Sequence, residues 1–223
     1  MGLADWARRW DSPPRRETVG EKIKQFVSPP PPVKVQILNA NYKIAAQISK
    51  LDFSLAKLTS YDKSLFEKVV DALVQGDKAK AAMYANEVAE VRKMAKTLLT
   101  IRYALERVKL RLETALVVGD TMRHLAPAVA ALKQVTGYMK GMMPDVFTEL
   151  IEVEESLNVA MMQMTASAPV HLSSEYVSEE ARKILQEASV VAEQRLKQEF
   201  PELPNLQAPT ALKDLEATVE EGK

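Results

Sequence analysis

Apolar residues recur every seven positions through the middle of the chain. From residue 33 to residue 75, one track consists of Ile37, Ile44, Leu51, Leu58, Leu65 and Ala72. A second track contains Ile48, Leu55 and Val69, and is interrupted by Asn41 and Asp62. Side chains seven residues apart lie on the same stripe of an α-helix, and two such tracks are typical of a coiled-coil seam. The pattern predicts a helix over residues 33–75, about 65 Å long.

The same spacing resumes after Gly76 and Asp77, which supply a helix stop and a new N-cap. One track of this second helix is Val91, Leu98, Leu105 and Leu112, and the other is Met94, Ile101, Val108, Ala115, Met122 and Val129. Because the connection is very short, we expect the two helices to pack antiparallel as a hairpin. Candidate bends that could divide the second helix are Gly119, Pro127, Gly137 and Gly141.

Two shorter amphipathic helices are predicted after the boundary at Met143 and Pro144. Residues 145–164 carry an apolar stripe of Val146, Leu150, Val153, Leu157 and Met161. After a break over residues 165–173, residues 174–198 carry a stripe of Val177, Ala181, Ile184, Ala188 and Val191. The chain then becomes proline-rich from Phe200 onward, which predicts an extended segment.

The first ten residues also fit a short amphipathic helix. Leu3, Trp6 and Trp10 share one face, while Arg8 and Arg9 lie on the other. Tryptophan suits a bilayer interface because its ring is apolar and its N–H can remain hydrated. We therefore predict a membrane-binding segment made of these five residues. The alternative is a terminal helix that docks on the protein's own core.

These elements define an all-α fold with four parts. Residues 1–32 form an amphipathic start and a proline-rich linker, in which the prolines at 29–32 favour a stiff spacer. Residues 33–142 form the helical hairpin core, residues 143–198 the acidic helices, and residues 199–223 an extended partner-binding motif and tail.

The charge is divided between the two ends of the chain. The formal net charge is zero, yet residues 1–142 carry 24 basic and 14 acidic side chains, and residues 143–223 carry 6 and 16. Such asymmetry predicts that the acidic part folds back on the basic body, or that the body binds an anionic polymer or lipid. Random drift of solvated surface charge is the alternative.

Residues that could support catalysis are scarce. The chain has no cysteine and two histidines, and it contains no nucleotide-binding glycine motif and no nucleophile elbow. Glu152, Glu154 and Glu155 are adjacent carboxylates, which are typical of a solvated helix face. We expect no enzyme activity, no metal site and no cofactor. No apolar run could span a bilayer and the first residues are charged, so a cytoplasmic location is expected.

Apolar residues also lie off the predicted seam. They are Leu38, Ala45, Phe53, Phe66 and Leu73 in the first helix, and Leu99, Leu110, Leu116 and Leu132 in the second. Apolar surface left exposed on a thin hairpin usually marks an interaction site. Repeated docking of one hairpin on the next, with an offset that does not close, would give a filament. Release of the acidic helices could expose this surface.

The order and charge of these parts resemble the ESCRT-III (Snf-type) membrane-remodelling proteins, and among them the archaeal Cdv-type cell-division subunits. The resemblance rests on the tryptophan-bearing start, the basic hairpin with its turn at Gly76 and Asp77, the acidic helices, and the stretch FPELPNLQAP at residues 200–209. It extends over residues 25–209. It implies a filament that coats and constricts the cytoplasmic side of a membrane during cell division or vesicle budding.

The stretch at residues 200–209 is similar to the proline-containing motif with which this family recruits the MIT domain of its AAA ATPase. On this resemblance, the partner-binding residues are Phe200, Pro201, Leu203, Pro204, Leu206 and Pro209. The implied partners are further copies or paralogues, the ATPase and anionic lipid, and the implied location is peripheral membrane at the division site. No residues remain for the winged-helix region of some archaeal members, which implies a shorter paralogue.

Two other functions remain open. A soluble coiled-coil adaptor would share the heptads, but it would have no use for Trp6 and Trp10. A basic coiled coil that binds nucleic acid would explain the positive hairpin. However, acidic residues such as Glu90 and Glu106 are mixed among the basic side chains of the hairpin, and aromatic residues are few. We therefore expect no nucleic acid partner.

Overall fold

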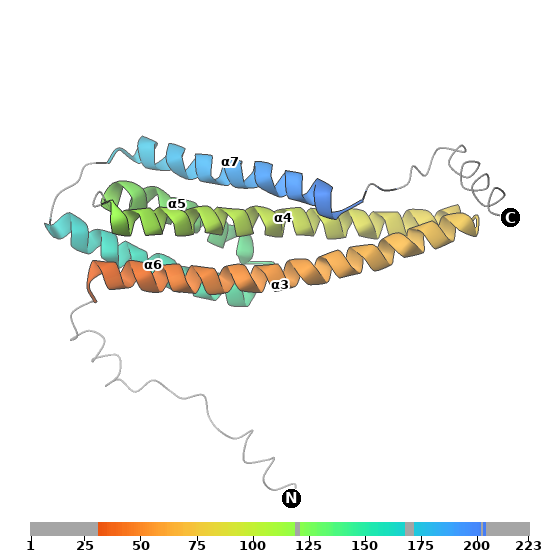
Figure 1. Ribbon diagram of the computed structural model, residues 1–223, viewed down its shortest axis with the longest axis horizontal. Helices are drawn as coiled ribbons and strands as arrows, with labels where there is room; N and C mark the ends of the chain where they lie inside the picture. The colour runs from red at the N-terminus through yellow and green to blue at the C-terminus, as the bar shows by residue number, and fades with distance from the viewer. Residues whose placement is uncertain (1–30, 119–120, 168–171, 202, 204–223) are drawn as a thin grey trace, which may run out of the picture. The chain divides into compact units, whose positions relative to one another are not determined.

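The computed structural model describes residues 31–118, 121–167, 172–201 and 203. Within these ranges the chain forms helices and no strand (Figure 1). The helices are α3 (Val33–Val74), α4 (Lys78–Val117), α5 (Thr121–Met139), α6 (Pro144–Ser167) and α7 (Ser174–Glu199). The predicted all-α fold with a long hairpin is confirmed. The helix expected over residues 1–10 and most of the predicted motif at residues 200–209 lie outside the described residues.

The turn of the hairpin is stabilised as its sequence predicts. Gly76 adopts a φ of 74°, a left-handed conformation that costs glycine little. The N–H of Asp77 donates to the carbonyl of Ala72 at 2.9 Å, which satisfies a free carbonyl at the end of α3. The side chain of Asp77 then accepts from the N–H of Lys80 at 2.9 Å and caps α4. The chain therefore reverses within three residues.

The heptad tracks form the seam between α3 and α4. Leucine and isoleucine residues of the predicted tracks, among them Leu51 and Leu105, are completely buried. Met94 is the exception, because 49% of its surface is exposed. It lies toward the tip of the hairpin, where a separate small cluster of buried residues joins only α3 and α4: Leu65, Val69, Ala85, Val88 and Val91. Met94 is not part of this cluster, although the end of α7 reaches this level of α4, where Lys96 pairs with Glu193 and Arg92 lies against Phe200.

The helix break after α4 occurs at one of the predicted bends. Helix α4 ends at Val117 and α5 begins at Thr121, on either side of Gly119. Pro127 and Gly137, by contrast, lie inside α5, so the prediction of bends at these positions was wrong. Pro127 is buried together with Leu125 and Ala128. Packing against the core therefore holds the helix through the position where a backbone hydrogen bond is lost.

The shorter helices cover the open end of the hairpin. Helix α6 packs against α3 and α5, and α7 packs against α4 and α5 (Figure 1). A continuous apolar core, which includes Leu112, Leu132 and Leu150, joins all five helices in this half. Helix α6 runs to Ser167, three residues beyond the predicted end, and α7 begins after an N-cap at Ser173. The hairpin tip extends beyond this bundle as a pair of helices.

Candidate functional site

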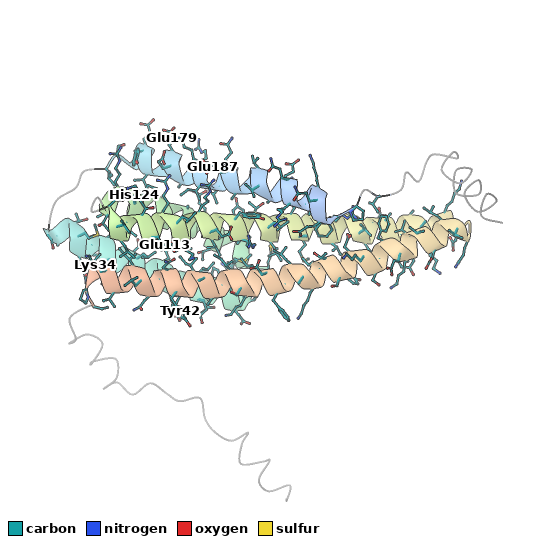
Figure 2. All side chains as sticks on the ribbon, in the orientation of Figure 1. Lys34, Tyr42, Glu113, His124, Glu179 and Glu187 are labelled. Carbon is teal, nitrogen blue, oxygen red and sulfur yellow. The ribbon has the colours of Figure 1, made fainter. Side chains whose placement is uncertain are left out.

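The acidic helix α7 is held on the basic helix α4 by a ladder of ion pairs. Arg111 contacts Glu180 at 2.9 Å, Arg107 contacts Glu187 at 3.0 Å, and Lys96 contacts Glu193 at 3.6 Å. The numbers rise along α7 as they fall along α4, so the helices run antiparallel. Figure 2 shows Glu179 and Glu187 on α7, with Glu113 on the underlying helix. The opposite charges of the two halves of the chain thus meet within one molecule.

The fully buried side chains of α7 are mostly small, although Leu185 and Leu196 also pack, partly buried, against the core. Its buried residues are Ala181, Ile184, Ala188 and Ala192, three of which are alanines. A cavity of about 570 Å³ also lies between α4, α5 and α7, bordered by Thr100, Tyr138 and Leu185 among others. Because small side chains bury little apolar area, we expect ion pairs to contribute a larger share of this contact than of the contact made by α6. Solvent-exposed ion pairs are each worth about 0.2–1 kcal/mol and weaken with salt.

Helix α6 is attached more firmly, on α3. Its buried stripe consists of larger residues, Val146, Leu150, Val153, Leu157 and Ala160. Lys43 contacts Glu152 at 2.7 Å, and the amide of Gln36 donates to Gln163 at 3.0 Å. These pairs also show that α3 and α6 are antiparallel. Because α6 buries the larger side chains, we expect α7 to detach first.

The ionisation of the paired groups favours the docked arrangement. Hydrogen bonds from Lys183 and Arg111 lower the pKa of Glu180 below its ordinary value of 4.5. The hydrogen bond to Glu152 raises the pKa of Lys43 above its ordinary value of 10.5, against a smaller opposing effect of burial. Both groups therefore carry their charges across the neutral range, and the acidic helices remain complementary to the hairpin there.

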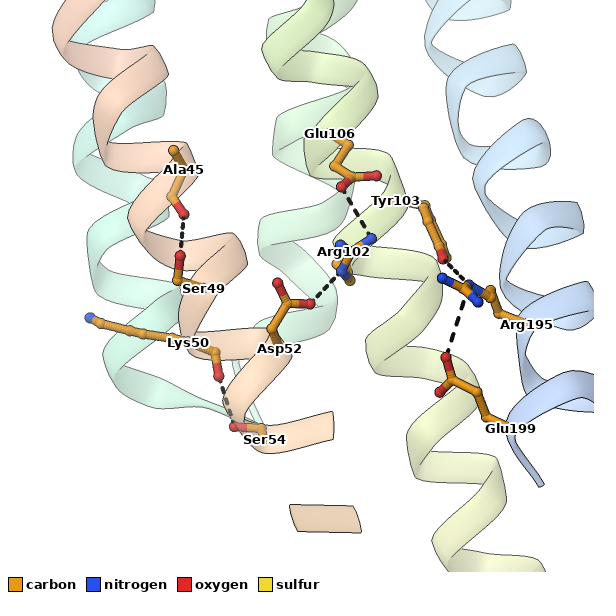
Figure 3. A network of polar contacts seen from close by, with 10 residues as sticks. All are labelled: Ala45, Ser49, Lys50, Asp52, Ser54, Arg102, Tyr103, Glu106, Arg195 and Glu199. Carbon is orange, nitrogen blue, oxygen red and sulfur yellow. Dashed lines mark hydrogen bonds and ion pairs between the residues drawn. The ribbon is translucent and has the colours of Figure 1, made fainter. Parts of the chain in front are cut away.

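A polar network links the middle of the hairpin to the end of α7. Arg102 of α4 pairs with Asp52 of α3 and with Glu106 one turn further along α4 (Figure 3). The neighbouring residue, Tyr103, accepts a hydrogen bond from Arg195 of α7 at 3.2 Å, and Arg195 also contacts Glu199 at 3.9 Å. Adjacent positions on α4 therefore hold α3 on one side and the C-terminal helix on the other.

The C-terminal segment meets the hairpin at a buried ion pair. Asp62, whose side chain is 1% exposed, accepts from Arg92 through both carboxylate oxygens, at 2.8 and 3.1 Å. The guanidinium of Arg92 also lies 5.7 Å from the ring centre of Phe200. Phe200 is only 5% exposed, and Leu203 packs against the small cluster at the hairpin tip. Arg92 therefore contacts α3 and the C-terminal segment at once.

Three of the residues predicted to bind an MIT domain lie in this C-terminal segment of the structure. Phe200 is buried against the body, Pro201 is exposed and Leu203 is partly covered. Pro204, Leu206 and Pro209 lie outside the described residues, as do Leu3, Trp6, Arg8, Arg9 and Trp10 of the predicted membrane segment. The assignments of both sets stay predictions. The sequence analysis missed Arg92, and it noted Asp62 only as an interruption of the heptads, which is the signal that could have led to the pair.

The described residues hold no group of three or more metal-ligating side chains. None of the described helices combines the length and apolarity that a bilayer-spanning helix needs. The adjacent carboxylates at Glu154 and Glu155 form no shared site, since Glu155 faces solvent while Glu154 is half-buried. The candidate functional features of the described residues are therefore the contacts of α7 and of the C-terminal segment with the hairpin.

Comparison with known proteins gives relatives of one kind. The chain is 43% identical over 173 residues to cell division protein B1 of Sulfolobus acidocaldarius, a match that covers 78% of this chain and 81% of the relative. It is 31% identical over 169 residues to cell division protein B of the same organism, covering 76% of this chain and 65% of that protein. Cell division protein B3 is 28% identical over 153 residues, or 68% and 87% of the two chains. No family model and no solved structure matches the chain.

Proposed function

The chain belongs to the ESCRT-III-like family of archaeal cell division B proteins, and from this premise we propose that it is a structural subunit of filaments that constrict a membrane during cell division. Family membership supports the role in division. The shape of the hairpin supports a structural role, because its tip projects as a two-helix arm whose small core joins only α3 and α4. The presence of several B-type paralogues in one organism supports mixed filaments as well as filaments of one chain.

The docking of α7 is the observation that carries the proposal furthest. A helix held by ion pairs and mostly small side chains can dissociate at lower cost than one held by a leucine stripe, and its departure would uncover basic side chains such as Arg107 and Arg111. An anionic membrane offers the same charge as the departing helix. In this proposal the membrane and α7 compete for the basic face of α4. Binding of the chain to the membrane is therefore coupled to the release of α7.

Two further contacts belong to the proposal. Leu3, Trp6 and Trp10 would insert into the bilayer interface, with Arg8 and Arg9 near the lipid headgroups. A single short helix binds weakly, so many copies in one filament would be needed for stable attachment. Residues 200–209 would bind the MIT domain of an AAA ATPase, and this requires Phe200 and Leu203 to leave their contacts on the hairpin.

Vesicle sedimentation tests the proposal. The full chain is incubated with anionic and with neutral vesicles at low and high salt, and the pellets are examined for ordered assemblies. We expect sedimentation with anionic vesicles that decreases as salt is raised, because charge attraction is screened. A chain that stays in the supernatant with both lipids at low salt, while keeping its helical circular dichroism, would instead support the soluble adaptor.

A further inference from the structure

Helix α3 presents a long uncharged stripe on the side away from the core. Its members follow one another at spacings of three and four residues, and every one of them is exposed: Val35, Leu38, Tyr42, Ala46, Ser49, Phe53, Ala56, Ser60 and Ser64. We call these residues the α3 outer stripe. Figure 2 shows Tyr42 on the side of α3 that faces away from α4. Tyr42 is 79% exposed and Phe53 is 63% exposed, which marks the stripe as an interaction surface.

The two ends of the α3 outer stripe differ. Its beginning is apolar, with Val35, Leu38 and Tyr42. Its second half is flanked by Lys50 and Lys57, and Lys57 lies 4.3 Å from the ring centre of Phe53. Among the described residues, no carboxylate lies within ion-pair distance of Lys50 or Lys57. Two shallow hollows meet at Phe53. One, of about 510 Å³, is lined by α3 alone, and the other, of about 410 Å³, lies between α3 and the start of the chain's own α6, at Asp145 and Val146. A partner should therefore be apolar at one end and acidic at the other.

Helix α6 has an exposed stripe with this pattern. Its members are also three and four residues apart and are all exposed: Asp145, Thr148, Glu152, Glu155, Val159, Met162 and Ala166. We call them the α6 outer stripe. The acidic residues come first and the apolar residues last, and α6 contains no lysine or arginine. The α6 outer stripe is thus acidic and then apolar along the chain, whereas the α3 outer stripe is apolar and then flanked by basic residues.

The two stripes match in a single antiparallel register. With Lys57 placed opposite Asp145 and Lys50 opposite Glu152, Tyr42 falls within one residue of Val159 and Leu38 within two residues of Met162. Within one molecule α3 and α6 are already antiparallel, with Lys43 at Glu152. The matching register is the same relation displaced by seven residues, or about 10 Å along the helix. Lys50 is one heptad from Lys43, so it borders the α3 outer stripe on the side nearer the chain's own α6.

We infer that the α3 outer stripe binds the α6 outer stripe of a second copy of this chain. The inference rests on the proposed function and supplies its filament contact. Because the two stripes are different surfaces, the contact is heterologous and can propagate along a filament. About 30 Å of α6 in a groove about 10 Å wide buries a few hundred Å² per partner, less than stable dimers bury. The contact therefore becomes effective when many copies gather on one membrane.

Cross-linking between two single-cysteine variants tests the inference, because the natural chain has no cysteine. Ala46→Cys in one full-length chain and Glu155→Cys in the other are mixed on anionic vesicles and treated with a short bis-maleimide. We expect a mixed dimer. Adding Lys50→Glu and Lys57→Glu to the Ala46→Cys chain should abolish it, and adding Asp145→Lys and Glu152→Lys to the partner should restore it. Reversal of Lys78 and Lys80 at the hairpin turn is the matched control and should leave the mixed dimer intact.

The outcomes separate the competing explanations. If the parent chain assembles on vesicles but no mixed dimer forms, the inference is wrong and the proposed function stands. If the reversal of Lys50 and Lys57 weakens vesicle binding more than the control does and leaves cross-linking unchanged, the α3 outer stripe is a lipid surface, which also overturns it. If the parent chain does not assemble at all, both proposals fall. Circular dichroism shows whether each variant is folded.

Discussion

At the scale of single residues, the Asp62–Arg92 pair decides how the hairpin tip and the C-terminal segment meet. A buried carboxylate in a helical seam is costly unless a cation satisfies it, and Arg92 does so with two hydrogen bonds. The same guanidinium covers the ring of Phe200. One side chain therefore serves both the stability of the tip and the placement of the segment that follows α7.

Removing one partner of the Asp62–Arg92 pair should lower the free energy of unfolding more than replacing both partners with apolar residues. Arg92→Leu leaves the carboxylate of Asp62 buried and unpaired, which should lower the free energy of unfolding by about 3–5 kcal/mol. The double change Asp62→Leu with Arg92→Leu should recover most of that loss, because two apolar side chains suit the seam. Thermal and urea unfolding measure both. Lys93→Leu, at a neighbouring exposed position, is the control and should have little effect; equal losses in the single and double variants would contradict the account.

The partner motif gives a second prediction at this scale. Leu203→Asp with Leu206→Asp should abolish binding of an MIT domain in calorimetry, because apolar side chains on an extended peptide fill pockets between helices. Helical circular dichroism should be unchanged. Glu202→Lys is a control within the same stretch. Binding that survives the double change would move recruitment to α7 or to the acidic end of the chain.

At the scale of elements, the two acidic helices are held by different means. Helix α6 buries leucine and valine residues on α3 and α5, whereas α7 buries mainly alanine and depends on its ion pairs. Acid should therefore affect α7 first. The pKa of Glu180 is lowered in the folded protein, so its contribution is present above its ordinary pKa of 4.5 and is lost as the pH falls through the lowered value. We expect the amide hydrogens of α7 to lose protection as the pH falls below 4.5, before those of α6; simultaneous loss would contradict the difference.

Charge reversal on α7 should release it at neutral pH. Glu180→Lys with Glu187→Lys places cations opposite Arg111 and Arg107, which should speed hydrogen exchange in α7 and increase sedimentation with anionic vesicles. Glu175→Lys with Glu179→Lys changes the net charge equally without touching the contacts to α4. If both variants sediment to the same extent, the gain comes from net charge alone, and the competition between α7 and the membrane is wrong.

The periodic elements were predictable from the sequence, and the contacts between them were not. Heptads such as Ile37, Ile44 and Leu51 placed the hairpin, and Gly76 with Asp77 placed its turn, because these signals are local. The bend predicted at Pro127 is absent because tertiary packing of α5 outweighs the local effect of the proline. Met94 shows the limit of the heptad pattern, because it continues an apolar track of α4 and is still 49% exposed. The partners of Asp62 and Glu180 lie 30 and 69 residues away, and no local pattern specifies them.

At the scale of the whole molecule, the basic hairpin and the acidic helices neutralise each other in one chain. The same complementarity is available between chains, through the α3 and α6 outer stripes, and between the chain and an anionic membrane. A subunit whose acidic helices are docked can therefore exchange these contacts for contacts of the same chemistry with a second chain or with a membrane. We propose that this exchange yields membrane-bound filaments.

Electron microscopy of the purified full chain with anionic and with neutral vesicles tests that claim most directly. The account predicts regular filaments or coated tubes on anionic vesicles, bare neutral vesicles, and few filaments in the absence of lipid. Tubes should be lost when Trp6 and Trp10 are both changed to alanine, since the interfacial anchor is then removed. Smooth, uncoated anionic vesicles at low salt, in a sample that circular dichroism shows to be folded, would contradict the account.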